Sequence, residues 1–242
     1  MFGRGLRTLS IASLVLVLGA FSLVFFYAPN DADQGFVQKI FYLHVPLAII
    51  ALCGFVTGGI YGIQYLRSGD RMHDLRSYVA IHQSLILGVG VLLTGAIWAK
   101  ASWGHYWVWD EPTLVAFLIV FLLYACYQPL RFSIEDPERQ ARYAAVFAII
   151  GGAFVPLNFL AVRMAESLAH PRVLSTTGGA MPGDMRLTFY VSLAGFICLF
   201  ITLWKYELAS KAASIRLRSL KRRLAGDDGL APLARSASPQ QL

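Results

Sequence analysis

Six long apolar runs, separated by short polar segments, make up most of this chain. They cover roughly residues 9–27, 40–66, 78–100, 113–130, 143–165 and 187–206. Each run is long enough, at about 20 residues, to cross the hydrocarbon core of a bilayer as a helix. The runs are continuous rather than alternating, and in lipid only helices or closed barrels satisfy every backbone polar group. The pattern therefore predicts an all-α integral membrane protein, a bundle of six transmembrane helices.

Lysine and arginine are distributed unequally between the segments that separate these runs. Sixteen of the 21 basic residues lie on one side, in the N-terminal segment, residues 67–77, residues 131–142 and the C-terminal tail. Cytoplasmic loops are enriched in these residues, so we expect both termini in the cytoplasm of a cell with an inner membrane, and segments 28–39, 101–112 and 166–186 outside. The five basic residues on the outer side are Lys39, Lys100, Arg163, Arg172 and Arg186.

The C-terminal region divides the chain into three predicted parts. Residues 1–206 form the six-span domain. Residues 207–225 carry apolar residues among lysines and arginines, which predicts a basic cytoplasmic helix on anionic lipid headgroups. Residues 226–242, rich in Gly, Ala, Pro, Ser and Gln, are predicted to be disordered. Because the net charge of +7 is concentrated at the ends of apolar runs, we expect membrane lipid and not nucleic acid as its partner.

Glycines and cysteines inside the runs allow two further predictions, one on helix contact and one on burial. Glycines in the second and third runs let neighbouring helices approach closely; they are Gly58, Gly59, Gly62, Gly88 and Gly90. The three cysteines form neither a CxxC nor a CxxCH motif, which excludes a thiol-redox motif and covalent haem attachment. We expect them to be buried as small apolar side chains; they are Cys53, Cys126 and Cys198.

Residues 103–110 read Trp-Gly-His-Tyr-Trp-Val-Trp-Asp, between two apolar runs on the outer side. The segment holds three of the five tryptophans, whose flat, polarisable faces suit a flat ligand. The alternative is a belt of Trp and Tyr at the membrane interface. The density of aromatic residues, together with Gly104 and Asp110, favours a binding loop. His105 either bonds a ligand carboxylate or is a polar surface residue.

Two other histidines are candidate metal ligands on the same side. His44 lies near the outer start of the second run, and an ionisable residue within the membrane is a functional candidate; the alternative is a histidine bonded to a neighbouring carbonyl. His170 lies in the third outer segment. Two neutral imidazoles can hold a haem iron from opposite faces. Zinc needs three or four close ligands, which the outer side offers less readily. His73 and His82 are expected to be structural or solvated on the inner side.

The outer lysines and arginines allow two interpretations. Haem propionates require cationic partners, and charge-assisted bonds to arginine are the strong kind. Alternatively, each of these residues anchors its helix by extending its charged end to the interface.

The motif and the histidines resemble those of a family of haem-handling membrane proteins. The Trp-Gly-x-x-Trp-x-Trp-Asp pattern of residues 103–110 is similar to the tryptophan-rich motif shared by the cytochrome c maturation proteins CcmC and CcmF and by CcsA-type haem synthetases. His44, followed by Val-Pro, resembles the first histidine site of CcmC, and His170 after the fifth run matches the second. Six runs in 242 residues fit CcmC, the short member. The resemblance covers residues 1 to about 206.

The resemblance implies a haem site at the periplasmic face. His44 and His170 would be axial ligands of a non-covalent haem b, and the motif would form the haem platform: Trp103, Gly104, Trp107, Trp109 and Asp110, with His105 and Tyr106 in the same loop. The implied partners are the periplasmic haem chaperone CcmE, CcmD and the CcmA/CcmB transporter. The implied role is haem binding and transfer rather than catalysis.

Two departures from the family pattern and three other function classes accompany this interpretation. Glu111-Pro112 stands where an arginine is expected after the motif, and residues 164–167 lack the tryptophans expected before His170. Both departures bear on partner contact more than on haem binding. A permease subunit that exports haem or another solute is one alternative, and a larger synthetase-type enzyme that ligates haem is another. A structural scaffold would need neither histidine.

Overall fold

The computed structural model describes residues 5–165, 170 and 181–224. Within these residues, six helical segments are long and apolar enough to cross a membrane, which confirms a multi-pass all-α membrane protein. The 3-10 helix η1 continues directly into α2, and α4 continues into α5, so each pair makes one span. The elements are α1 (Leu6–Phe26), η1 (Phe36–Ile40), α2 (Phe41–Ser68), α3 (Arg71–Trp103), α4 (Pro112–Ala125), α5 (Tyr127–Phe132), α6 (Pro137–Met164) and α7 (Gly183–Leu224).

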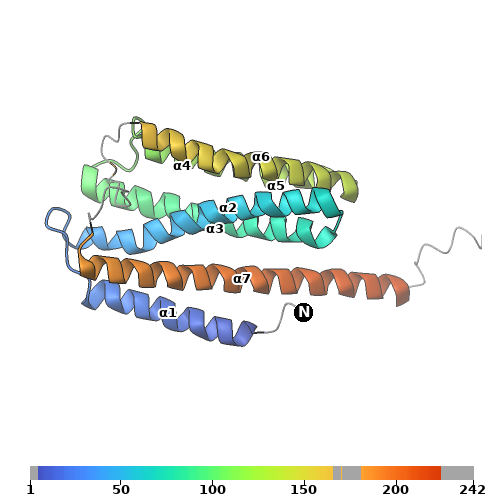
Figure 1. The fold of residues 1–242 in the computed structure, drawn as a ribbon, viewed down its shortest axis with the longest axis horizontal. Coiled ribbons are helices and arrows are strands. Elements are labelled where there is room, and N and C mark those ends of the chain that lie inside the picture. The colour runs from blue at the N-terminus through green and yellow to red at the C-terminus, as the bar shows by residue number, and fades with distance from the viewer. Residues whose placement is uncertain (1–4, 166–169, 171–180, 225–242) are drawn as a thin grey trace, which may run out of the picture.

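The helices form three layers, each made of two neighbouring spans (Figure 1). One layer is α1 with α7, the middle layer is α2 with α3, and the third is α4 and α5 with α6. Helix α2 contacts α3, α6 and α7, so it lies at the centre of the bundle. Helix α1 begins and α7 ends at the same end of the bundle, as an even number of spans requires. That this end faces the cytoplasm stays a prediction from the charge distribution.

Helices α2 and α6 approach each other through glycines. A Cβ added to Gly59 would lie 2.9 Å from the Ala148 carbonyl oxygen and 3.3 Å from the Gly152 Cα. A Cβ on Gly62 would lie 2.9 Å from the Ala145 carbonyl oxygen. The expectation that glycines allow close helix contact is therefore confirmed at these positions. Such contact matters in lipid, where association depends on van der Waals packing rather than on the hydrophobic effect.

Polar residues near the end of the bundle where α1 begins are paired between helices (Figure 1). The buried Arg131 guanidinium donates to both carboxylate oxygens of Asp74, each at 2.7 Å, which joins α5 to α3. His82 Nδ1 lies 2.9 Å from Glu207 Oε1 and so links α3 to α7. Pairing offsets part of the cost of holding charged groups within the membrane. The expected structural role of His82 agrees with this contact.

The expectation that the cysteines are buried was wrong. Cys53 and Cys126 are exposed on the outside of the bundle, and Cys198 is half-buried. A membrane helix carries apolar residues on all its faces, so an apolar neighbourhood in the sequence does not distinguish the helix core from the lipid-facing surface.

Helix α7 runs without a break for 42 residues and extends past the other helices (Figure 1). Its last part contains the basic segment predicted for residues 207–225, which is helical to Leu224. A position of this segment on lipid headgroups stays a prediction. Residues 226–242 lie outside the described part of the chain.

Candidate functional site

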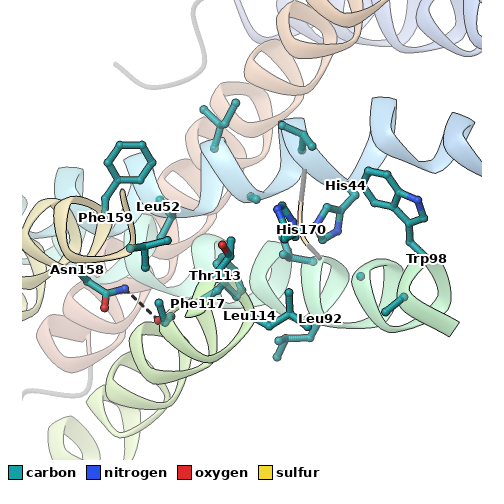
Figure 2. A pocket seen from close by; sticks show the side chains of 18 of the residues that line it. His44, Leu52, Leu92, Trp98, Thr113, Leu114, Phe117, Asn158, Phe159 and His170 are labelled. Atoms are coloured by element: carbon teal, nitrogen blue, oxygen red, sulfur yellow. Dashed lines mark hydrogen bonds between the residues drawn. The ribbon is translucent and has the colours of Figure 1, made fainter. Parts of the chain in front are cut away.

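A cavity of about 260 Å³ lies between α2, α3, α4 and α6, and it reaches the loop between α3 and α4. Its lining is mostly aliphatic and aromatic. Figure 2 shows side chains from α2 and α3 facing side chains from α4 and α6 across this space. The polar lining residues are few, and they are Gln34, His44, Thr113, Asn158, Arg163 and His170. An apolar space with a few placed polar groups is the usual form of a cofactor site.

His44 enters the cavity from the first turn of α2 and is held by α3. Its Nδ1 atom lies 3.0 Å from the Thr94 hydroxyl oxygen. Trp98 meets the ring at its edge, with the two ring centroids 5.8 Å apart and the planes at 77° (Figure 2). One side of the imidazole thus contacts a hydroxyl of α3, and the residue also lines the cavity.

His170 is held beside His44 by a buried carboxylate. Its backbone N–H donates to Glu111 Oε2 at 3.2 Å, and its ring lies 6.4 Å from the Trp103 ring. Glu111 is fully buried. The two imidazoles line the same cavity and lie next to each other in Figure 2. The structure thus brings together the two histidines that the sequence singled out.

Glu111 has a role that sequence reasoning missed. Its other oxygen, Oε1, accepts from the Thr113 backbone N–H at 3.4 Å, so the residue caps the N-terminus of α4. Pro112 follows at the first helical position, where its missing N–H costs nothing. From the amino-acid sequence, Glu111-Pro112 was interpreted only as a departure from the family motif. An acidic residue before proline at the start of an apolar run was the available signal for a helix cap.

The tryptophans of the motif differ in position. Trp103 is the last residue of α3, and both Trp103 and Trp107 line the cavity. The indole Nε1 of Trp107 is buried without a hydrogen-bond partner among the described residues. Trp109 is 72% exposed and meets the Trp107 ring edge-on, with centroids 5.8 Å apart. The cavity wall is therefore formed by two of the three tryptophans of the motif.

The other residues of the motif lie outside the cavity lining. Gly104 has φ +79° and ends α3 in the left-handed conformation that glycine adopts at least cost. Tyr106 is 63% exposed, with the Lys100 ammonium 5.4 Å from its ring centroid. His105 and Asp110 are exposed. A contribution of these four residues to a haem platform stays a prediction.

Among the described outer cations, Arg163 is the one that lines the cavity. Its guanidinium lies 5.1 Å from the Phe159 ring centroid. Lys100 donates to the Gly104 carbonyl at 2.8 Å, and Lys39 donates to the Phe25 carbonyl at 3.4 Å, so both help to close helix ends. Arg172 lies outside the described residues.

The residues of this cavity fit a haem. Two imidazoles supply nitrogen donors for an iron, and indole rings with aliphatic side chains supply apolar walls for a flat macrocycle. Arg163 supplies a cation for a propionate. A zinc site fits less well, because no group of three or more His, Cys, Asp or Glu side chains suited to a metal ion occurs in the described part of the chain.

Comparisons with known proteins agree with this assessment. Residues 1–223 match the family described as "CcmC: Heme exporter protein C". The chain is 31% identical to heme exporter protein C of Bradyrhizobium diazoefficiens over 224 residues, which cover 90% of this chain and 82% of the relative. It is 30% identical to heme exporter protein C of Paracoccus denitrificans over 197 residues, 81% of each chain. A ccmC-like mitochondrial protein of cytochrome c biosynthesis from Marchantia polymorpha is 30% identical over 180 residues, 74% of this chain and 76% of the relative.

Proposed function

Because the chain belongs to the CcmC family of heme exporter proteins, which handle haem in cytochrome c biogenesis, we propose that it presents a non-covalent haem b on the periplasmic face of the inner membrane and passes it to the haem chaperone CcmE. CcmD and the CcmA/CcmB transporter are the further partners in this proposal. The observation that carries it is the placement of His44 and His170 in one cavity walled by Trp103 and Trp107.

Five residues of the cavity and its apolar lining have stated roles in this proposal. His44 and His170 would hold the haem iron through ring nitrogens. Trp103 and Trp107 offer ring faces and edges to the porphyrin, and Arg163 pairs with a propionate. The apolar lining from α4 and α6 excludes water from the buried edge of the ligand.

The two histidines lie in different parts of the fold, and this difference bears on transfer. His44 lies on a transmembrane helix and is packed between Thr94 and Trp98 of α3. His170 lies outside the helices, and its backbone N–H donates to Glu111. A ligand on a connecting segment exchanges more readily than one on a packed helix. We therefore expect His170 to release the iron first when an acceptor approaches.

The absorption spectrum of the purified full-length protein tests the ligand assignment. The wild-type protein should show a low-spin Soret spectrum, and the double variant His44→Ala, His170→Ala should lose it. His73→Ala is a matched control, because His73 stacks on Tyr61 at the opposite end of the bundle and should leave the spectrum unchanged. A double variant with the wild-type spectrum would overturn the assignment.

Mixing the haem-loaded protein with purified CcmE tests the transfer step. We expect the haem spectrum to move from this protein to the chaperone, and to move faster from His170→Ala than from wild type. A haem that stays bound in the presence of excess chaperone would contradict transfer and favour a permease or a scaffold.

A further inference from the structure

The Thr94 hydroxyl has three neighbours that together determine its hydrogen-bond roles. It lies 2.7 Å from the Gly90 carbonyl oxygen, 3.3 Å from the Val91 carbonyl oxygen and 3.0 Å from His44 Nδ1. Carbonyl oxygens only accept, and a hydroxyl has one hydrogen to donate. The short contact to Gly90 uses that hydrogen. The Thr94 oxygen must therefore accept from His44, which requires a proton on Nδ1.

A proton on Nδ1 decides which ring nitrogen of His44 is free. A neutral imidazole carries one proton, so a proton on Nδ1 leaves a lone pair on Nε2. We propose that Thr94 is a positioning residue that holds His44 in the Nδ1–H tautomer, so that Nε2 is the atom offered to the haem iron. This inference rests on the proposed function, in which His44 is an axial ligand. It adds a residue on α3 that the motif and the two histidines do not include.

The rest of this face of α3 restrains the same ring. A Cβ added to Gly95 would lie 2.9 Å from His44 Cε1, so only glycine leaves room for the imidazole. Trp98, one helical turn after Thr94, contacts the imidazole of His44 edge-on. The indole N–H of Trp98 donates to Gln34 Oε1 at 2.8 Å. Thr94 therefore sets the tautomer of a ring whose position is already limited by Gly95 and Trp98.

The physical benefit is preorganisation of the ligand. A metal-ligating histidine usually donates its second ring N–H to an acceptor, which fixes the tautomer and the ring orientation. Without that acceptor, the ring also populates the tautomer whose Nε2–H points at the iron and cannot bind it. Loss of such an acceptor typically lowers metal affinity about 10- to 100-fold. We expect the lower end of this range for Thr94, because Gly95 and Trp98 still restrain the ring when the hydroxyl is removed.

The tautomer can be measured without haem. The full-length apoprotein, labelled with nitrogen-15 at its five histidines, would be studied by NMR, with the His44 signals identified by their loss in His44→Gln. The expected result is a protonated Nδ1 and an unprotonated Nε2. A protonated Nε2, or equal populations of the two tautomers, overturns the proposal.

Haem binding by Thr94 variants gives the second measurement. Thr94→Val keeps the shape of the side chain and removes the hydroxyl, and we expect haem to dissociate about ten times faster than from wild type, with a larger high-spin fraction. Thr94→Ser restores the hydroxyl and should restore both properties. Thr57→Val is the matched control, because Thr57 also bonds the carbonyl four residues earlier on a membrane helix, as Thr94 does, whereas the contact with His44 belongs to Thr94.

The outcomes separate this inference from the proposed function. Equal haem dissociation from Thr94→Val, Thr57→Val and wild type overturns the role of Thr94 even if His44 is a ligand. A normal low-spin spectrum in His44→Ala overturns the ligand role of His44, while the tautomer measurement still decides whether Thr94 sets the protonated nitrogen. If Thr94→Val fails to accumulate, the role of Thr94 is decided by the tautomer of the wild-type protein and by haem dissociation from Thr94→Ser.

Discussion

Replacing Glu111 by alanine should detach His170 from the cavity while leaving the helix bundle assembled. The substitution removes the cap on the Thr113 N–H and the hydrogen bond that the carboxylate accepts from the His170 N–H. The loss of a helix cap costs about 1 kcal/mol of stability. A hydrogen bond to a charged group contributes about 1.5–3 kcal/mol, which corresponds to a roughly 10- to 150-fold shift in the equilibrium between docked and undocked His170.

A second acidic cap in this chain serves as the matched control. Asp136 accepts from the Arg139 N–H at 2.7 Å and precedes Pro137 at the first position of α6, as Glu111 precedes Pro112 in α4. Asp136→Ala therefore removes a cap of the same design far from the cavity. Glu111→Gln retains a carbonyl acceptor but loses the charge, so it should fall between wild type and Glu111→Ala.

The assay is the low-spin haem fraction from absorption spectra, measured beside thermal unfolding of the same preparations. We expect both alanine variants to unfold at slightly lower temperature and only Glu111→Ala to lose most of its low-spin haem. The reasoning would be refuted by Glu111→Ala with the wild-type low-spin fraction, or by an equal haem loss in Asp136→Ala.

Three further predictions concern the bundle, the loop and the orientation. Gly59→Leu should lower protein accumulation and melting temperature, because its Cβ would lie 2.9 Å from a carbonyl oxygen of α6, whereas Gly19→Leu, with nothing within 4 Å, should not. Trp107→Ala should lower haem affinity about 2- to 13-fold, the equivalent of about 0.5–1.5 kcal/mol for one aromatic contact; the exposed Trp109→Ala should lower it less, and the reverse order would contradict the cavity assignment. Reporter fusions at residue 105 and after residue 224 should report opposite sides of the membrane; the same side for both would overturn the six-span topology.

The six spans could be predicted from hydropathy because lipid leaves the backbone few alternatives to a helix. The predicted ends were less accurate. The fifth run was predicted over 143–165, while α6 begins at Pro137, six residues earlier, because the Asp136 cap and Pro137 start the helix in polar sequence. Helix α3 likewise begins at Arg71, where the Asp70 side chain accepts from the Met72 N–H. Hydropathy detects the part of a helix that is in lipid, and caps determine where the helix starts.

The candidate site could be predicted in part. The motif and the resemblance pointed to His44, His170 and the tryptophans, and both histidines with Trp103 and Trp107 line one cavity. The residues that hold the histidines were not predicted. Thr94 and Glu111 are 50 and 59 residues from the histidines that they contact, so no local pattern connects each pair.

The amino-acid sequence by itself determined the number of spans, the helical class, the family and the residue types available for binding haem. Those properties depend on run length, composition and short motifs, which are local in the chain. Only the tertiary structure decided which face of each helix is buried, and the exposed Cys53 and Cys126 show why. In lipid both faces of a helix are apolar, so the choice depends on shape: glycines of α2 that admit α6, and Gly95 that admits the His44 ring.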